Sequence, residues 1–331
     1  MNQLAIRTEA QVAPVLMRGN VTPLLPTMSP RVDSLDSLIG RFLSAQDVKQ
    51  TSKDTYRKGL ERFFAWITEQ DGANPTREDI LAFKGYLDAQ GLSSFTLSTY
   101  LVAVRKFFEW AEGMKYYPNI ARGIKGAKKA RGFRKDPLTV DQVKELLSRV
   151  DRSTLQGKRD YALLNLLIRT GLRTVEVIRA DAGDIRQESG EAVLWIQGKG
   201  RDTKDEFVLL TQDTLKPLNE YLNSRGRVED KAPLFTSLSD RNRDQRLTTR
   251  TIREIVKQNL KGIGLDNERL TAHSLRHTAI TLSLMGGATI QEAQALGRHS
   301  NINTTLIYAH NINRIAQAPE RKIDALLASV N

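Results

Sequence analysis

The chain has 331 residues, which is long enough for two domains with separate cores. With 50 Lys and Arg against 38 Asp and Glu, its formal net charge of +12 favours a polyanionic partner, nucleic acid first among the candidates. The absence of cysteine excludes disulfides and thiolate metal sites, and no apolar run reaches the length of a membrane span. We therefore expect a soluble, cytoplasmic protein without a signal peptide or membrane contact.

Residues 1–34 show no hydrophobic periodicity and hold four of the ten prolines, which predicts a flexible N-terminal arm. Over residues 35–121 apolar side chains then recur at helical spacing in four successive stretches. These stretches are Leu35 to Leu43, Leu60 to Ile67, Ile80 to Leu87 and Leu97 to Ala111. Thr76 is a suitable N-cap for the third, and Pro118 closes the fourth. The pattern predicts a four-helix domain.

Basic and aromatic side chains of this domain are candidate DNA contacts. They are Tyr56, Arg57, Arg105 and Lys106. Ordinary solvent-exposed positions are an equally open interpretation of all four, because charged side chains are mostly exposed in any domain.

Residues 122–136 form a predicted basic interdomain linker, which contains three glycines and no acidic residue before Asp136. Its self-repulsion would keep it extended, as in any solvated linker. Between two domains of a basic protein, a cationic strap across a DNA backbone is the alternative that we favour. Its candidate phosphate contacts are Lys125, Lys128, Lys129 and Arg131.

A second domain is predicted over residues 137–318. Thr139 and Gln142 form a capping box ahead of an apolar helical pattern, and most of the following stretches are also helical. The exception is the pair Val193–Ile196 and Phe207–Leu210, which predicts a β-hairpin around the turn Gly198-Lys199-Gly200. The fold class expected is mainly α, with a four-helix domain followed by a helix-rich domain that holds a small β-hairpin or sheet.

The second domain contains four polar motifs. They are Thr170-Gly171-Leu172-Arg173 followed by Glu176, His273-Ser274-Leu275-Arg276-His277, Gly297-Arg298-His299, and Thr304-Thr305-Leu306-Ile307-Tyr308. Each has a structural explanation on its own: His273 as a core histidine, Arg173 as the partner of Glu176, Tyr308 as a packing ring. Zinc is not expected, because no glutamate follows His273 as the zinc-protease motif requires.

Together, the order and intervals of these motifs resemble the tyrosine recombinase family, with the Xer and phage-integrase types most similar. The resemblance covers about residues 35 to 330. It implies that 35–121 is a core-binding domain that contacts DNA, that 137–318 is the catalytic domain, and that 319–331 is a C-terminal helix for subunit docking. In that helix Ile323, Leu326, Leu327 and Val330 share one apolar face. The alternative to subunit docking is that this face folds back on its own domain.

The resemblance also assigns roles. Arg173 and Arg276 match the pair that grips the scissile phosphate, which suits the bidentate geometry of guanidinium groups. Lys199 matches the general acid that protonates the leaving 5′ oxygen. Tyr308 matches the nucleophile that forms a 3′-phosphotyrosine.

Three further positions take supporting roles in the same comparison. His273 matches the residue that assists removal of the tyrosine proton, His299 the residue that hydrogen-bonds the phosphate, and Glu176 a structural brace. The family usually has glycine directly before the His of the third motif, whereas here Arg298 intervenes after Gly297. The resulting loop geometry, and whether Arg298 contacts phosphate, are left open by the sequence.

The resemblance implies a site-specific recombinase that serves integration or excision of a mobile element, or resolution of DNA molecules. No nucleotide cofactor is expected, because a phosphotyrosine conserves the energy of the broken phosphodiester. No metal is expected either, because the arginines and the lysine supply the positive charge that magnesium brings elsewhere. The expected partners are double-stranded recombination sites, a homotetramer on DNA that is monomeric or weakly associated without it, and accessory proteins. The alternatives are a type IB topoisomerase-like activity, which needs no synapsis, and a non-catalytic DNA-binding protein.

Overall fold

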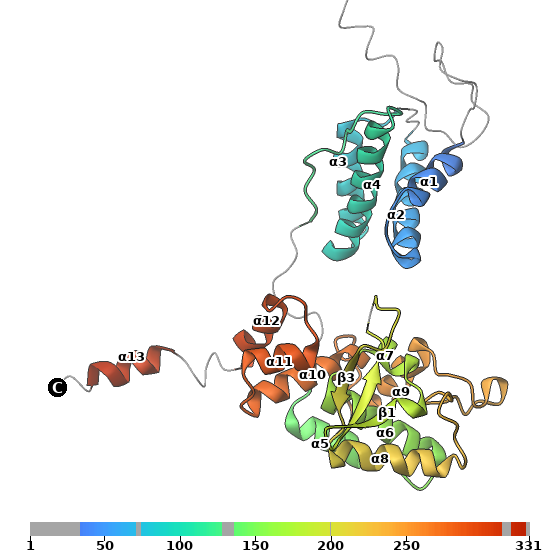
Figure 1. Cartoon of the computed structure of the whole chain (residues 1–331). Coiled ribbons are helices and arrows are strands. Elements are labelled where there is room, and N and C mark those ends of the chain that lie inside the picture. The colour runs from blue at the N-terminus through green and yellow to red at the C-terminus, as the bar shows by residue number, and fades with distance from the viewer. Residues whose placement is uncertain (1–33, 71–73, 128–135, 199, 313–318, 329–331) are drawn as a thin grey trace, which may run out of the picture. The chain divides into compact units, whose positions relative to one another are not determined.

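The computed structural model describes residues 34–70, 74–127, 136–198, 200–312 and 319–328. The chain divides into two compact units, Met1–Arg131 and Gly132–Asn331, each with its own hydrophobic core (Figure 1). The predicted fold class, mainly α with one small sheet, is confirmed. No helix in the described ranges combines the length and apolar character that a membrane crossing requires.

Over its described residues the first unit contains four helices. They are α1 (Leu35–Ser44), α2 (Gln50–Glu69), α3 (Arg77–Ala89) and α4 (Ser94–Gly113). The predicted N-cap at Thr76 is confirmed, since its hydroxyl accepts a hydrogen bond from the Asp79 N–H and the Asp79 carboxylate accepts one from the Thr76 N–H. Helices α2 and α4 pack along each other. Their interface is aromatic, with the rings of Phe64 and Phe107 5.4 Å apart in an edge-to-face arrangement.

The first part of the second unit contains helices packed around α6 (Leu155–Thr170), which is buried over most of its length. The others are α5 (Val140–Ser148), α7 (Thr174–Arg179), α8 (Gln212–Ser224) and α9 (Thr249–Gly262). The capping box predicted at Thr139 is confirmed. Helix α6 packs against α8 on one side and against α10 (Ala272–Met285) on another, which explains why apolar residues occur around its whole circumference.

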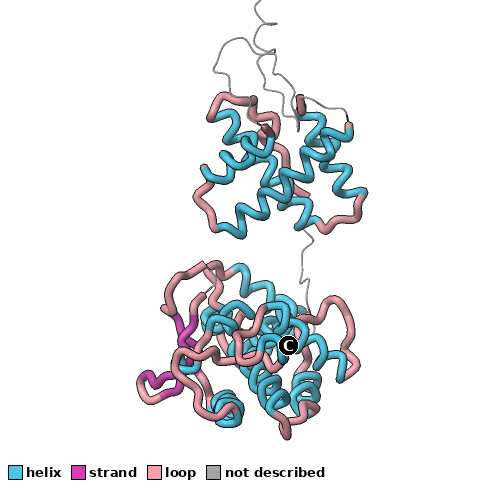
Figure 2. The backbone as a smooth tube through the Cα atoms, turned by 90° about the vertical axis from the view of Figure 1, so that its right-hand side faces the viewer, coloured by secondary structure: helices cyan, strands magenta, loops and turns pink. Residues whose placement is uncertain are grey.

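A three-stranded antiparallel sheet lies at one edge of this unit (Figure 2). The strands are β1 (Ile185–Glu188), β2 (Glu191–Ile196) and β3 (Glu206–Leu209). The predicted hairpin is the β2–β3 pair, in register with Val193 opposite Leu209, and the sequence prediction missed β1. Two single-turn 3-10 helices, Ala182–Asp184 and Asp240–Asn242, complete the connections.

The C-terminal part contains α11 (Ile290–Gly297), α12 (Asn303–Ile312) and α13 (Pro319–Ala328). Helices α10, α11 and α12 pack against one another, and α10 also packs on α6. This arrangement brings the ends of α6 and α11 beside the first turns of α10. All four polar motifs therefore lie in the same region of the second unit.

Candidate active site

The first motif is placed by the end of α6. Gly171 caps this helix in the left-handed conformation with φ 60°, which a residue with a Cβ rarely adopts, and a Cβ there would lie 3.4 Å from Ala279 of α10. The chain turns sharply after the glycine and starts α7 with Arg173 as its N-cap. The turn leaves the Gly171 carbonyl directed at α10 and places Arg173 next to it.

Glu176, in the first turn of α7, is fully buried and accepts three hydrogen bonds. Its Oε1 accepts from the Arg173 side chain at 2.7 Å. Its Oε2 accepts from the Arg173 main-chain N–H at 2.7 Å and from the Arg298 guanidinium at 3.0 Å. A buried carboxylate with these partners fixes the orientation of both arginines.

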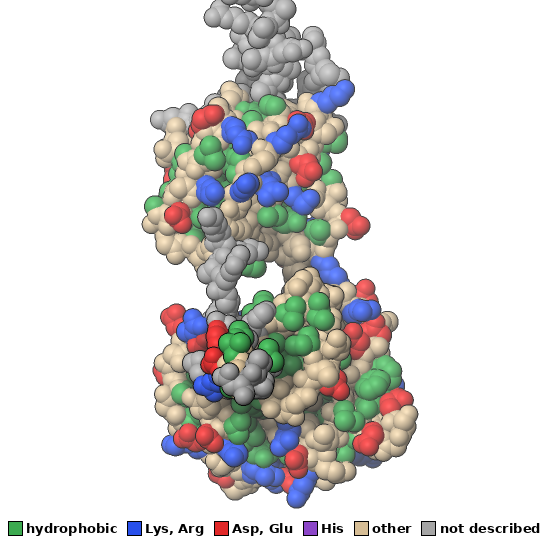
Figure 3. All heavy atoms as spheres, turned by 90° about the vertical axis from the view of Figure 1, so that its left-hand side faces the viewer, with side chains coloured by type: hydrophobic (Ala, Val, Ile, Leu, Met, Phe, Trp, Pro, Cys, Tyr) green, Lys and Arg blue, Asp and Glu red, His purple; other side chains and the backbone are tan. Residues whose placement is uncertain are grey.

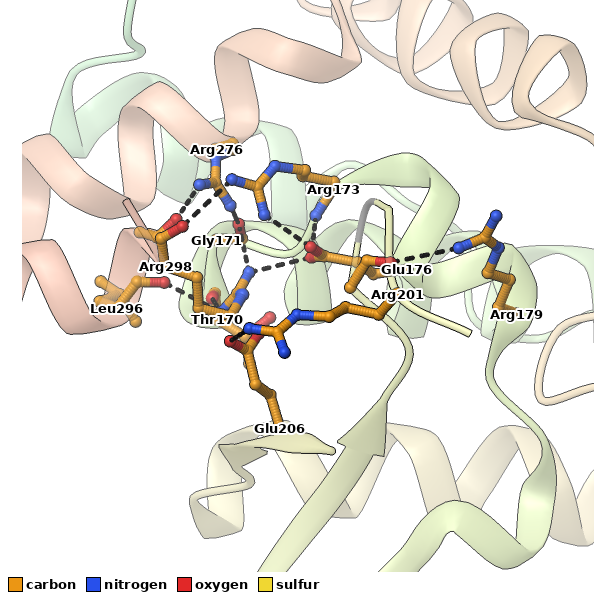
Figure 4. Close-up of polar contacts among 12 residues, drawn as sticks. Thr170, Gly171, Arg173, Glu176, Arg179, Arg201, Glu206, Arg276, Leu296 and Arg298 are labelled. Carbon is orange, nitrogen blue, oxygen red and sulfur yellow. Dashed lines mark hydrogen bonds and ion pairs between the residues drawn. The ribbon is translucent and has the colours of Figure 1, made fainter. Parts of the chain in front are cut away.

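Arg276 approaches from α10 and is 2% exposed. Its Nη1 donates to the Gly171 carbonyl at 2.6 Å and its Nη2 donates to the Gly297 carbonyl. Burial lowers the pKa of Arg276 to about 9, helped by the nearby charges of Arg173 and Arg298, so the group stays cationic at neutral pH. The side chains of Arg173 and Arg276 lie next to each other (Figure 4).

Tyr308 lies on α12, where its ring is 3% exposed. The ring stacks on His299 at a centroid distance of 6.0 Å and lies 5.1 Å from His277, whose ring is in turn 4.8 Å from His273. Burial raises the pKa of Tyr308 to about 12, although Arg276 and Arg173 oppose the shift. The hydroxyl is therefore protonated at neutral pH, and a base is needed before it can act as a nucleophile.

The His299 ring is held by its Nδ1, which lies 2.9 Å from the Thr305 hydroxyl of α12. Burial lowers the pKa of His299 to about 4, and the positive charges of Arg276, Arg173 and Arg298 act in the same direction. His299 is consequently neutral at pH 7 and able to hydrogen-bond without adding charge. His273, by contrast, is exposed on the first turn of α10.

The departure from the family pattern has a structural explanation. Gly297 ends α11, and a Cβ there would lie 2.9–3.1 Å from three atoms of the His299 ring, so the ring occupies the space that a side chain would need. Arg298 then takes the left-handed position with φ 47°. Its side chain turns to Glu176 and to main-chain carbonyls, whereas the sequence left a phosphate contact open.

An open cavity of about 690 Å³ borders this cluster. Its walls include Arg173, Arg298 and His299, together with Arg201 of the β2–β3 connection and Gln294 of α11. The full lining holds three arginines and one carboxylate, that of Glu206, 3.8 Å from Arg201, so the cavity favours an anionic ligand. The sequence analysis gave no role to Arg201, Gln294 or Thr305. Thr305 could have been found from the sequence, because it belongs to the quoted motif that ends in Tyr308.

Several predicted site residues are not part of this cluster. In the first unit Arg57, Arg105, Lys106 and Lys125 are exposed, and Tyr56 is half-buried with its ring 6.2 Å from that of Phe42. The remaining predicted residues lie outside the described part of the chain. These are Lys128, Lys129 and Arg131 of the linker and Lys199 of the hairpin turn. Next to Lys199, the Gly198 carbonyl accepts a hydrogen bond from Arg179 at 3.2 Å.

Comparison with known proteins identifies relatives of both units. A sequence model of the Phage integrase family matches residues 137–314, and a model of the phage integrase N-terminal SAM-like domain matches residues 40–114. A tyrosine recombinase of Synechococcus elongatus is 30% identical over 270 residues, which cover 78% of this chain and 83% of that protein. The tyrosine recombinase XerC of Herpetosiphon aurantiacus is 31% identical over 287 residues, covering 83% and 90%.

Among solved structures, the fold is similar to that of the XerH site-specific recombinase bound to a palindromic difH substrate. The TM-score is 0.68 with 21% sequence identity, and the match covers 86% of this chain and 83% of the other. At that level of identity the likeness concerns the fold.

Proposed function

The chain belongs to the Phage integrase family of tyrosine recombinases, and from that premise we propose that it is a site-specific recombinase that breaks and rejoins DNA through a 3′-phosphotyrosine at Tyr308. One observation carries the assignment of the site. Arg173, Arg276 and Tyr308 come from segments far apart in the sequence, yet all three meet at the turn 297–299. Arg276 donates to the Gly297 carbonyl and Arg173 to the Arg298 carbonyl, while the Tyr308 ring stacks on His299 at 6.0 Å. Two rigid cations beside a buried phenol match the needs of a phosphodiester under nucleophilic attack.

The partner is double-stranded DNA that carries a recombination site. The net charge of +12 supports a polyanionic partner, and Lys and Arg side chains gather on one face of the first unit (Figure 3). The exposed Arg57, Arg105, Lys106 and Lys125 are the described residues that we assign to phosphate or base contacts. Lys128, Lys129 and Arg131 of the linker are assigned to the same role from their sequence.

In the proposed reaction Arg173 and Arg276 hold the two non-bridging oxygens of the scissile phosphate and stabilise the charge that grows on them. His299, neutral and anchored through Thr305, donates a hydrogen bond to the same phosphate. Glu176 keeps its structural role as the brace beneath Arg173.

Proton transfers complete the reaction. His273, exposed at the start of α10, takes the hydroxyl proton as the Tyr308 oxygen forms its bond to phosphorus. The bond between phosphorus and the 5′ oxygen breaks, and Lys199 donates a proton to that leaving oxygen. A DNA 5′ hydroxyl later attacks the phosphotyrosine by the reverse path, which restores the phosphodiester and frees Tyr308.

The decisive experiment compares wild type with Tyr308→Phe on genomic fragments. Covalent protein–DNA adducts are recovered from a denaturing gel and sequenced, which yields the activity and the site together. We expect adducts only from wild type, while gel shifts on the recovered site show equal binding by both proteins. Adducts at the wild-type level from Tyr308→Phe would assign the nucleophile to another residue.

Strand exchange between two sites requires assembly, and we propose a homotetramer on DNA with α13 as the docking element. Ile323, Leu326 and Leu327 of α13 are 56%, 66% and 64% exposed, so this ten-residue helix presents its apolar side chains to solvent. Deletion from Pro319 onward should preserve binding to a single site and abolish synapsis in gel-shift and light-scattering assays. Normal synapsis by the truncated protein would show that α13 is not needed for assembly.

A further inference from the structure

Arg298 occupies a backbone conformation that is unusual for its residue type. Among the described residues, four that are not glycine have a positive φ: Lys115, Ser189, Asp244 and Arg298. The first three are exposed, whereas the Arg298 side chain is only 9% exposed. A non-glycine residue held in the left-handed region inside a site is a reason to look for a function of its side chain.

The Arg298 guanidinium connects three elements that carry the site. Its Nη1 donates to the Leu296 carbonyl of α11 at 2.9 Å, and its Nη2 donates to the Gly171 carbonyl at the end of α6 at 3.0 Å. The same Nη2 lies 3.0 Å from Oε2 of Glu176 on α7. Figure 4 shows this guanidinium between the carbonyls and the carboxylate.

Arg298 also contacts Arg173 through its backbone. The Arg298 carbonyl accepts a hydrogen bond from Nη2 of Arg173 at 3.3 Å, while Nη1 of Arg173 donates to Glu176 at 2.7 Å. Both anchors of the Arg173 guanidinium therefore depend on Arg298, one through its carbonyl and one through the carboxylate that its side chain holds. A rotation of the Arg298 peptide would release one of them.

The charges of the cluster also depend on Arg298. Glu176 is fully buried and lies between two arginines. With Arg298 present, the three guanidinium groups of Arg173, Arg276 and Arg298 and the one carboxylate leave two net positive charges, and without it only one remains. The positive charge of Arg298 thus offsets the negative charge of Glu176. The positive charges of Arg173 and Arg276 can then stabilise a phosphodiester.

We propose that Arg298 is a positioning residue for the recombination reaction, which orients Arg173 and fixes the turn that carries His299. This inference rests on the proposed function and deepens it. The family pattern has glycine at the position before the histidine. In this chain the arginine at that position orders the turn through its contacts with Glu176 and with the Gly171 and Leu296 carbonyls. The competing explanation is that the Arg298 side chain contributes to folding stability only.

Arg298→Gly separates these explanations, because glycine adopts φ 47° without strain and is the residue usual in the family. Arg298→Lys retains the charge but replaces the planar fork, whose Nη1 and Nη2 reach separate acceptors, by a single ammonium nitrogen. The matched control is Arg159→Ala, which removes another buried arginine that pairs with Asp160 at 2.8 Å, away from the polar cluster. Single-turnover cleavage on a nicked suicide substrate is measured at saturating DNA, well below the melting temperature of every variant.

We expect Arg298→Gly to lower the cleavage rate by about ten- to a hundredfold with nearly unchanged DNA affinity, as misplaced catalytic groups do. Arg298→Lys should lie between Arg298→Gly and wild type, and Arg159→Ala should cleave at the wild-type rate. Millimolar guanidinium, but not methylammonium, should restore part of the rate to Arg298→Gly, because the lost side chain borders an open cavity. A wild-type rate for Arg298→Gly overturns the inference.

A second measurement does not depend on cleavage. Inorganic sulfate is titrated into each protein, and the ring resonances of His299 are followed by NMR. Weaker sulfate binding by Arg298→Gly than by Arg159→Ala supports the inference, and equal binding contradicts it. If wild type binds sulfate but forms no adduct on any DNA, the proposed function fails while the sulfate affinities still decide the role of Arg298. If wild type does neither, both proposals fall.

Discussion

Substitution of Gly297 by alanine tests whether the position of His299 controls the reaction. A Cβ at residue 297 would lie 2.9 Å from Cε1, 3.0 Å from Nδ1 and 3.1 Å from Nε2 of the His299 ring. The ring cannot simply swing away, because Nδ1 lies 2.9 Å from the Thr305 hydroxyl and the ring stacks on Tyr308. The added methyl group must therefore displace the imidazole, the helix end or both.

The displacement follows from the contact distances. Ordinary Cβ contacts begin at 3.4 Å, so relief of the 2.9 Å contact requires a shift of about 0.5 Å at Cε1. A misplacement of about 1 Å can cost about a hundredfold in rate, so half that distance predicts a loss of about tenfold. Helix propensity favours alanine over glycine by about 0.5–1 kcal/mol, but relief of the overpacked contact costs about 1–3 kcal/mol, so the net effect on folding stability is a modest loss.

Gly262→Ala is the matched control. Gly262 also ends its helix, α9, and a Cβ there meets nothing closer than 3.9 Å. Single-turnover cleavage and thermal unfolding are measured for both variants. We expect a loss of cleavage for Gly297→Ala alone, measured at a temperature at which both variants are fully folded, with at most a modest fall in its melting temperature. Equal cleavage by the two alanine variants would show that the position of the His299 ring does not limit the reaction.

Three further predictions follow from the site and the linker. Lys199→Ala should cleave ordinary DNA slowly but recover on a 5′-bridging phosphorothiolate, whose leaving group needs no proton, and absence of recovery would exclude a general acid at this position. Burial lowers the pKa of His277 to about 4, below its unfolded value near 6.5, so the stability that it contributes is complete above pH 6.5 and declines as the pH falls toward 4. At pH 5 the loss is about 2 kcal/mol, and urea unfolding of His277→Gln should show a correspondingly smaller decline between pH 7.5 and 5. Alanine at Lys128, Lys129 and Arg131 should make the negative slope of log affinity against log salt shallower by about 3. An unchanged slope would show that the segment is only a linker.

Local sequence was sufficient where a structural feature depends on neighbours along the chain. The capping boxes at Thr76 and Thr139 were predictable because donor and acceptor lie three residues apart. The four helices of the first unit follow from apolar spacing, which its core confirms. Strand β1 was missed because Ile185–Glu188 has one apolar residue, and only pairing with β2 holds it in the sheet.

The motifs of the second unit identified the residue types of the site, and their order identified the family. The pair Arg173 and Glu176 lies three residues apart and was open to sequence reasoning, whereas the contacts that join α6 and α7 to α10 and α11 link residues more than a hundred positions apart and were not predictable. Arg276 reaches the Gly171 carbonyl across 105 positions, and Arg298 reaches Glu176 across 122. A buried guanidinium donates to whichever oxygens the packing of α6, α10 and α11 brings within reach. The sequence by itself therefore determined which groups are present, and the tertiary structure decided that Arg298 faces a carboxylate and that the His299 ring covers Gly297.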